Sequence, residues 1–259
     1  MGKRPSVFSR ILNALSTDIG IDLGTANTLV YVRGKGIVLN EPTIVAINKK
    51  TGQLVAVGAD AKAMLGRTPH HIEVIRPLVD GVISDFEVTE EMLAYLINKV
   101  RSETRSLVAP RVLVGVPSGI TNVEMRAARD AAKNAGAREV LLIEEPMAAA
   151  IGAKLPVGKA IGNMIIDIGG GTTDIAVISL SGIVVAKNLR VAGDHLNAAI
   201  VAYIRDQFKV LVGDKTAEDA KIVLSSIVQH EDGKEMVVRG RDVVTGLPRE
   251  VIITDTDIR

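Results

Sequence analysis

Hydrophobic residues along the chain follow two different periods, and their alternation predicts an α/β fold. Short runs rich in Val and Ile, separated by Gly, Asn and Pro, predict a meander of hairpins over residues 17 to 57. An apolar stripe at helical spacing then predicts an amphipathic helix over residues 89 to 105. The continuous apolar run at residues 111 to 116 predicts a buried strand. A helix that leads into a buried strand implies a layered sheet.

The second half of the chain repeats this alternation. A capping box and an Ala-rich run predict a helix over residues 121 to 134, and a strand follows at residues 139 to 143. Three further strand-like runs predict a second meander over residues 163 to 189. Two helices and two more strand-like runs come last. The first helix is expected from about Asp194 to Leu211, and a box of Thr216 and Asp219 is expected to open the second.

The first 16 residues have the pattern of a short amphipathic helix, with apolar residues on one face and Lys and Arg between them. This pattern is typical of a helix that lies in a membrane interface. A helix that packs on its own domain would show the same pattern, so both interpretations stay open. The apolar face comprises Phe8, Ile11, Leu12 and Leu15.

Composition narrows the class of protein. The 31 basic and 30 acidic side chains leave a net charge of +1, whereas nucleic-acid binders usually carry a basic surplus. Aromatic residues make up 2% of the chain, too few for the stacking platforms of single-strand binders. Cysteine is absent, which excludes disulfides and thiolate metal sites. We therefore expect a globular, cytoplasmic protein without a nucleic-acid partner.

An internal duplication is the most informative feature of the sequence. The segment IDLGTANTLVYV at residues 21 to 32 matches IDIGGGTTDIAV at residues 166 to 177, and Ile, Asp, Gly, Thr and Val recur in step. Each copy is followed by GIV, with one residue of slippage. We interpret the match as two copies of one hairpin unit. Two related domains that face each other across a cleft would be the natural product.

The turn after each Asp consists of small residues. Each of the three consecutive glycines in the second copy costs roughly 0.5 to 1 kcal/mol in ordered structure, so the run needs a backbone reason. We expect backbone N–H groups to approach phosphate oxygens there, with threonine hydroxyls as further donors. No Walker sequence is present, so this site would not be a P-loop. The candidate phosphate-binding residues are Thr25, Ala26, Asn27, Gly169, Gly170, Gly171, Thr172 and Thr173.

Asp22 and Asp167 stand at the ends of the two strands that precede these turns. Two carboxylates beside bound phosphates would repel each other and the phosphates unless a divalent cation lay between them. The two acids are therefore predicted partners of Mg²⁺, through its water ligands. The alternative is a pair of tight hairpins in which the acids only cap turns.

Glu145 lies between the two copies, in the segment LIEEPMAAAIGA. Pro146 suits the first position of a helix and disfavours helical backbone before it, so the glutamate should sit at the helix start. A fixed carboxylate near a phosphate can orient water. Alternatively, Glu144 and Glu145 only complement the helix dipole, and the spacing does not separate the two interpretations.

Taken together, these segments resemble a known superfamily. IDLGTANT, DIGGGTTD and the connecting EEPMAAAIGA are similar to the phosphate loops and the connecting motif of the actin, sugar-kinase and heat-shock chaperone ATPases. Within that superfamily, GKGIVLNEPTIVA, IRPLVDGVISDF, GVPSGIT and RGRDVVTGLP resemble the MreB family of rod-shape-determining bacterial actins. The resemblance extends from about Asp18 to Pro248.

The resemblance implies an actin-like fold, with two related domains around a cleft for ATP and Mg²⁺. It implies an ATPase that polymerises into filaments on the inner face of the cytoplasmic membrane and directs the cell-wall elongation machinery. Glu145 and Thr172 match the pair that positions the attacking water. The ribose and adenine contacts match Glu218, Asp219, Ala220 and Lys221. By spacing alone, Glu218 and Lys221 would form an ordinary helix face with an i,i+3 ion pair. The membrane contacts match the four apolar N-terminal residues together with Leu107 and Val108.

The expected organisation is a membrane-binding segment at residues 1 to 16, a first domain with an inserted small subdomain at 17 to 154, and a second domain at 155 to 259. In the family a further stretch follows the position of Arg259, so we expect the second domain to be incomplete here. A sugar-kinase-like phosphotransferase would need a base for a substrate hydroxyl, and no segment supplies one. That activity and an inactive partial chain are the alternatives.

Overall fold

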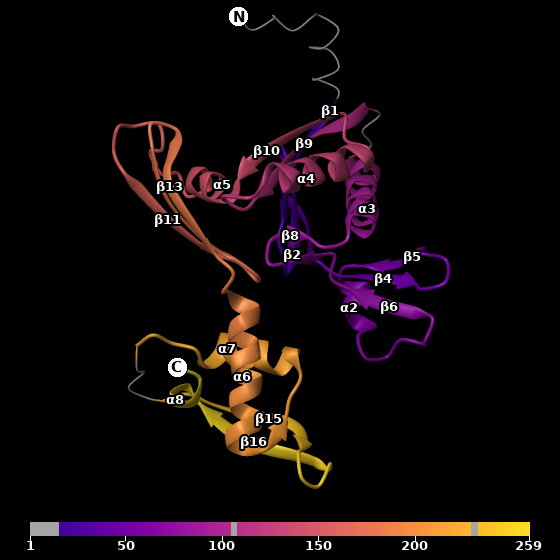
Figure 1. Cartoon of the computed structure of the whole chain (residues 1–259), viewed down its shortest axis with the longest axis vertical. Helices are drawn as coiled ribbons and strands as arrows, with labels where there is room; N and C mark the ends of the chain where they lie inside the picture. Colours follow the sequence, from indigo (N-terminus) through magenta and orange to yellow (C-terminus); the bar gives the residue numbers. More distant parts are fainter. Residues whose placement is uncertain (1–15, 105–107, 229–232) are drawn as a thin grey trace, which may run out of the picture. The chain divides into compact units, whose positions relative to one another are not determined.

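The computed structural model describes residues 16–104, 108–228 and 233–259. It divides into two compact units, one up to Arg190 and the other from Val191 onward, which we describe separately (Figure 1). Strands and helices alternate in both units, and this confirms the predicted α/β class. The domain boundaries expected after residues 16 and 154 stay predictions.

A five-stranded mixed sheet forms the centre of the first unit, in the order β10-β9-β1-β2-β3. Strands β1, β2 and β3 are antiparallel neighbours, whereas β9 and β10 run parallel to β1. The predicted hairpins and the predicted layered sheet are thus both present. The strands are β1 (Ser16–Leu23), β2 (Asn27–Val32), β3 (Gly36–Pro42), β9 (Val108–Val116) and β10 (Glu139–Glu144).

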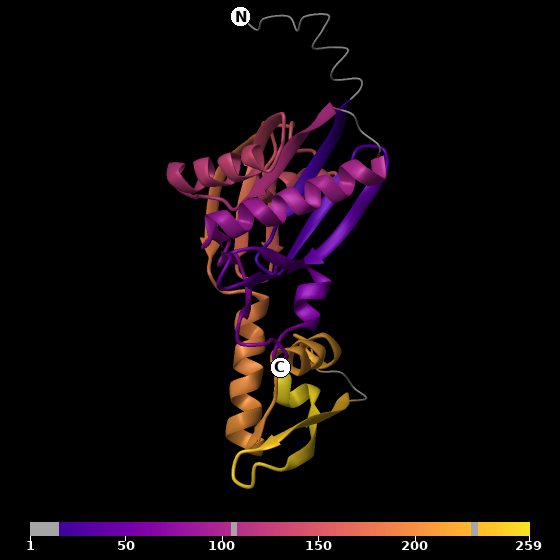
Figure 2. The same cartoon turned by 90° about the vertical axis from the view of Figure 1, so that its right-hand side faces the viewer.

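Two helices, α3 (Phe86–Thr104) and α4 (Asn122–Asn134), cover one face of this sheet and lie in front of the strands in Figure 2. The capping box of Thr121 and Glu124 is present at the start of α4, as predicted. The apolar stripe of α3 packs against alternate residues of the strands, since successive strand residues point to opposite faces. The core includes Ile19, Ile21, Val30, Val32, Met92, Leu93, Leu96, Ile97, Val100, Val112 and Val114.

A small sheet in the order β5-β4-β6 is inserted between β3 and α3. It has its own core of Ile44, Ala46 and Ala61. We call this part, residues 43 to 76, the inserted subdomain. Its elements are β4 (Val45–Asn48), β5 (Leu54–Val57), α2 (Ala59–Ala63) and β6 (Ile72–Ile75), and the short pair β7 (Leu78–Val79) and β8 (Val82–Ile83) follows it.

The second meander is a three-stranded antiparallel sheet of β11 (Asn163–Ile168), β12 (Thr173–Ser179) and β13 (Gly182–Leu189). It repeats the β1-β2-β3 arrangement, as the internal duplication predicts. Helix α5 (Glu145–Gly152) packs on it through Ala150, which is buried with Ala176 of β12.

The second unit packs two helices against a three-stranded sheet. The predicted helix end at Leu211 is wrong, because Lys209 adopts a left-handed backbone and the next two residues pair with β15. The box of Thr216 and Asp219 is also wrong: α7 starts at Asp214, so Thr216 already lies in its first turn. The elements are α6 (Gly193–Phe208), β14 (Val210–Leu211), α7 (Asp214–Leu224), β15 (Glu235–Asp242), β16 (Pro248–Thr254) and α8 (Asp255–Ile258).

Candidate functional site

The two hairpins place the two predicted metal partners at equivalent positions. Asp22 pairs across its hairpin with Leu29, and Asp167 pairs with Asp174. Each acid stands one residue before its strand ends, and the turn of small residues follows directly. The duplication seen in the sequence is therefore a duplication of geometry.

The two turns lie against each other within the first unit. A methyl group added at Gly170 would meet the Cβ of Ala26 at 2.5 Å, and one added at Gly171 would meet Oγ1 of Thr25 at 2.7 Å. Carbon atoms in ordinary contact stay about 3.5 to 4.0 Å apart. Only glycine fits at these two positions, so the close approach of the turns explains Gly170 and Gly171. The structure thus brings the two predicted phosphate loops together.

Glu145 completes an acidic cluster beside these loops. It stands at the start of α5, as predicted, but it is itself the first helical residue, so the helix begins one residue before Pro146. Its Cγ lies 3.4 Å from the position of a Cβ on Gly115. Burial, together with the carboxylates of Asp22, Asp174 and Asp167, raises the pKa of Glu145 to about 8. A carboxyl group with such a pKa sits where a general base or a water-orienting group is useful.

The two predicted metal partners share this environment. Protein atoms crowded around Asp22, and then the Asp167 carboxylate, raise the pKa of Asp22. Burial and the Asp174 carboxylate raise the pKa of Asp167 in the same direction. A divalent cation would relieve the repulsion among these carboxylate oxygens, which are hard donors, so the residues fit Mg²⁺. Within the described ranges, no group of three or more His, Asp or Glu side chains forms a metal site.

Asp174 is a member of the cluster that the sequence analysis missed. Its side chain is buried, and it accepts hydrogen bonds from the Ser118 backbone N–H at 2.9 Å and from Nδ2 of Asn188 at 2.9 Å. The Ser118 hydroxyl in turn donates to Glu144 at 3.1 Å. Asp174 therefore ties the second hairpin to the segment after β9. The signal in the sequence was its position opposite Asp167 in a hairpin.

The turn of Asp80 and Gly81 is a second feature that the sequence analysis missed. Asp80 has a φ of 50°, and the Gly81 N–H donates to Oγ1 of Thr25 at 2.9 Å. A Cβ at Gly81 would lie 3.0 Å from Cγ2 of Thr172. The turn thus contacts both predicted phosphate loops.

The predicted ribose and adenine contacts lie in the second unit, on α7. Lys221 forms an i,i+3 ion pair with Glu218 at 2.6 Å, and Asn197 also donates to Glu218 at 2.6 Å. Asp219 is exposed, whereas the side chain of Ala220 is buried in the core of this unit. A ligand at this helix would meet Ala220 through its backbone.

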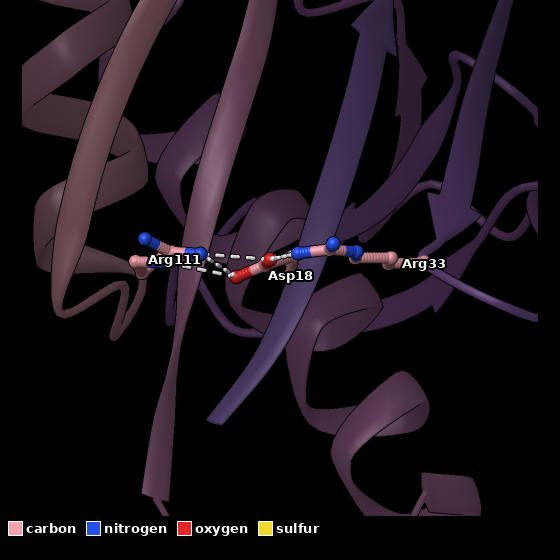
Figure 3. Close-up of polar contacts among 3 residues, drawn as sticks. All are labelled: Asp18, Arg33 and Arg111. Carbon is pink, nitrogen blue, oxygen red and sulfur yellow. Dashed lines mark hydrogen bonds and ion pairs between the residues drawn. The ribbon is translucent and has the colours of Figure 1, made fainter. Parts of the chain in front are cut away.

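The opposite end of the five-stranded sheet carries an ion-pair network, drawn in Figure 3. Arg111 donates two hydrogen bonds of 2.8 Å to Asp18, and Arg33 donates a third at 3.1 Å. Burial alone would raise the pKa of Asp18, but the two guanidinium groups outweigh it and hold this pKa below its usual value. Because the strands β1 and β9 are parallel, Ser16 and Val108 pair at this same end.

Five of the six residues predicted to contact a membrane, namely Phe8, Ile11, Leu12, Leu15 and Leu107, lie outside the described residues. The sixth, Val108, is the first residue of β9 and is partly buried. Among the residues that the structure describes, no helix combines the length and the apolar character needed to cross a membrane.

Comparison with known proteins finds one family throughout. The profile of the MreB/Mbl protein family matches residues 16–259. The cell shape-determining protein MreB of Escherichia coli strain K12 is 53% identical over 256 residues, which cover 97% of this chain and 74% of the relative. The cell shape-determining protein Mbl of Bacillus subtilis strain 168 is 50% identical over 242 residues, which cover 93% of this chain and 72% of the relative.

Solved structures give the same result. MreB5 of Spiroplasma citri bound to ADP superposes with a TM-score of 0.86 at 43% identity, over 94% of this chain and 73% of that one. The MamK double helical filament superposes with a TM-score of 0.76 over 94% of this chain and 74% of that one; at 23% identity it bears on the fold alone.

Proposed function

Since the chain belongs to the MreB/Mbl protein family, we propose that it is a cell-shape protein that binds ATP with Mg²⁺, hydrolyses it and polymerises into filaments. Its fold is actin-like, as the resemblance implied. The relatives with about 50% identity are named cell shape-determining proteins. The solved MreB5 structures are complexes with ADP and with AMPPNP, which supports a nucleotide site here.

One observation carries the proposal for the nucleotide site: the two turns of small residues lie against each other, beside four carboxylates. In this proposal the backbone N–H groups of residues 25–27, Gly170 and Gly171 hold the phosphates, and the hydroxyls of Thr172 and Thr173 assist them. The N–H of Gly169, predicted from the sequence to join them, instead donates to the carbonyl oxygen of Thr172 at 2.8 Å. Asp22 and Asp167 hold the cation through water. A bound Mg²⁺ supplies the positive charge that phosphates and carboxylates in one site require.

Glu145 and Thr172 position the attacking water in this proposal. The raised pKa of Glu145 keeps it largely protonated at neutral pH when only the surrounding acids act on it. Added positive charge in the site favours its carboxylate form, which accepts a hydrogen bond from water. In this proposal Glu145 can therefore orient water only when ATP and the cation are bound. Residues 218–221, which match the family's ribose and adenine contacts, are assigned to those parts of the nucleotide.

We place the filaments at the inner face of the cytoplasmic membrane, where they act on the cell-wall elongation machinery. The N-terminal segment with Phe8, Ile11, Leu12 and Leu15 and the segment with Leu107 and Val108 make the membrane contact. Support comes from the pairing of Ser16 with Val108, since both segments join the sheet at the same end. Apolar residues flanked by arginines at one end of a domain suit an anionic membrane surface.

The test is pelleting of the chain with liposomes that contain anionic lipid, with and without Mg-ATP, beside assays of phosphate release and electron microscopy. We expect nucleotide-dependent filaments that pellet with the liposomes, and phosphate release without any added acceptor. Glu145→Gln should slow phosphate release at least tenfold, whereas Glu139→Gln, an exposed glutamate at the other end of β10, should not. Absence of ATP binding and of polymer would refute the proposal.

A further inference from the structure

The inserted subdomain is joined to the five-stranded sheet by two connections, and both contact the first phosphate loop. The incoming connection passes through Thr43, which is 1% exposed. The outgoing connection passes through Gly81, whose N–H donates to Oγ1 of Thr25. No part of the proposed function uses Thr43, yet it makes two hydrogen bonds to this loop.

Thr43 binds two carbonyl groups of the loop with two different donors. Its hydroxyl donates to the carbonyl oxygen of Gly24 at 2.6 Å, and its backbone N–H donates to the carbonyl oxygen of Ala26 at 2.9 Å. Because the hydroxyl hydrogen of Thr43 is used toward Gly24, the hydroxyl of Thr28, 2.9 Å away, is the donor in their mutual bond. Both threonine side chains are buried, whereas the acceptor residues Gly24 and Ala26 are partly buried.

These bonds fix the direction of the loop's own donors. In a trans peptide unit the carbonyl of one residue and the N–H of the next point in opposite directions. When Thr43 holds the carbonyls of Gly24 and Ala26, the N–H groups of Thr25 and Asn27 must point away from it. Those two N–H groups are among the donors assigned to phosphate.

We infer that Thr43 is a positioning residue that aims the phosphate-binding N–H groups of Thr25 and Asn27 and couples them to the inserted subdomain. The inference rests on the proposed nucleotide site. The coupling follows from the chain itself: the next residue, Ile44, belongs to the core of the inserted subdomain. A shift of the loop on phosphate binding therefore displaces the first residue of that core.

The test compares Thr43→Val, which keeps the shape but removes the hydroxyl, with Thr43→Ser, which keeps the hydroxyl. Thr28→Val is the matched control, because it removes a neighbouring buried hydroxyl but leaves the bonds to Gly24 and Ala26 in place. Two quantities are measured for each: the affinity for Mg-AMPPNP by calorimetry, and hydrogen exchange of residues 44–63 at saturating Mg-AMPPNP. Melting temperatures without nucleotide report the purely structural cost.

We expect Thr43→Val to weaken Mg-AMPPNP binding about tenfold and to abolish the slowing of exchange in residues 44–63 that saturating nucleotide causes in the wild type. Thr43→Ser and Thr28→Val should retain both, even where their melting temperatures fall. Wild-type affinity and wild-type protection in Thr43→Val would overturn the inference alone. Failure of the wild type to bind Mg-AMPPNP would overturn the proposed nucleotide site as well.

If Thr43→Val does not fold, hydrogen exchange in the wild type tests the inference instead. Exchange of the Thr43 and Gly81 amides, which both donate to the loop, should slow at least fivefold when Mg-AMPPNP binds. An unchanged rate at Thr43 in a wild-type chain that binds the nucleotide would show that the loop is not held through this residue.

Discussion

Gly170→Ala should disable the proposed nucleotide site through one methyl group. The added Cβ would lie 2.5 Å from the Cβ of Ala26 and 3.1 Å from its backbone N. Ordinary contact between carbons needs about 3.5 to 4.0 Å, so the two loops must separate by about 1 Å or more. A Cβ atom has no rotamer that would let it move aside. The backbone itself must therefore shift.

Such a shift acts directly on the groups assigned to phosphate. A misplacement of about 1 Å can cost on the order of 100-fold in rate, and hydrogen bonds stretched by that amount are largely lost. We expect the affinity for Mg-AMPPNP to fall at least tenfold, which corresponds to about 1.4 kcal/mol. Calorimetric titration measures this loss, and the melting temperature without nucleotide should change by far less than it does for a core substitution.

Gly169→Ala is the matched control, because the methyl group there would meet the carbonyl oxygen of Thr172 at 3.3 Å, a contact that a small adjustment relieves. It should bind nucleotide within about threefold of the wild type. Equal losses in both variants, or wild-type affinity in Gly170→Ala, would refute the argument from loop separation.

Three further substitutions test other parts of the molecule. Asp18→Asn should lower the free energy of unfolding at pH 7 by about 1 kcal/mol, measured by chemical denaturation. Because the pKa of Asp18 in the folded wild type lies below 3.8, this difference should vanish as the pH falls through the folded-state pKa. Asp22→Asn removes a charge that repels Glu145, so in magnesium-free buffer its melting temperature should rise, while the stabilisation by Mg-ATP should disappear. Gly240→Ala would place a methyl group against the backbone carbonyl of Leu211, and we expect it to destabilise the second unit by roughly 1 to 3 kcal/mol, measured as faster hydrogen exchange in β14 and β15.

The features that the sequence predicted correctly depend on short stretches of chain. The two hairpins are visible because apolar strands, an acid and small turn residues stand next to each other in both copies. Glu145 could be placed at a helix start because proline is favoured in the first turn of a helix, although its own backbone is helical and not extended as expected. The capping box at Thr121 is likewise a pattern of four residues.

The features that the sequence did not reveal depend on contacts between distant residues. Ser118 and Asp174 are 56 residues apart, as are Thr25 and Gly81, and no local sequence pattern predicts the hydrogen bond between either pair. The box at Thr216 failed for a related reason, since the helix starts three residues earlier, with Gly213 and not Thr216 as its N-cap. Local patterns give the elements, whereas the cluster around Glu145 arises only when the sheet assembles.

The parallel pairing of β1 with β9 also sets the order of events during synthesis. Asp18 and Arg111 are neighbours in the sheet but are separated by 93 residues of chain. At about 5 to 20 residues per second, a ribosome needs roughly 5 to 20 s to make that interval. During this interval β9 is not yet available to pair with β1, so the first hairpin, with Ile19 and Ile21, lacks part of its core. Closing a loop of this length is also slow. The first loop of the proposed nucleotide site is thus translated well before the strand that completes its sheet.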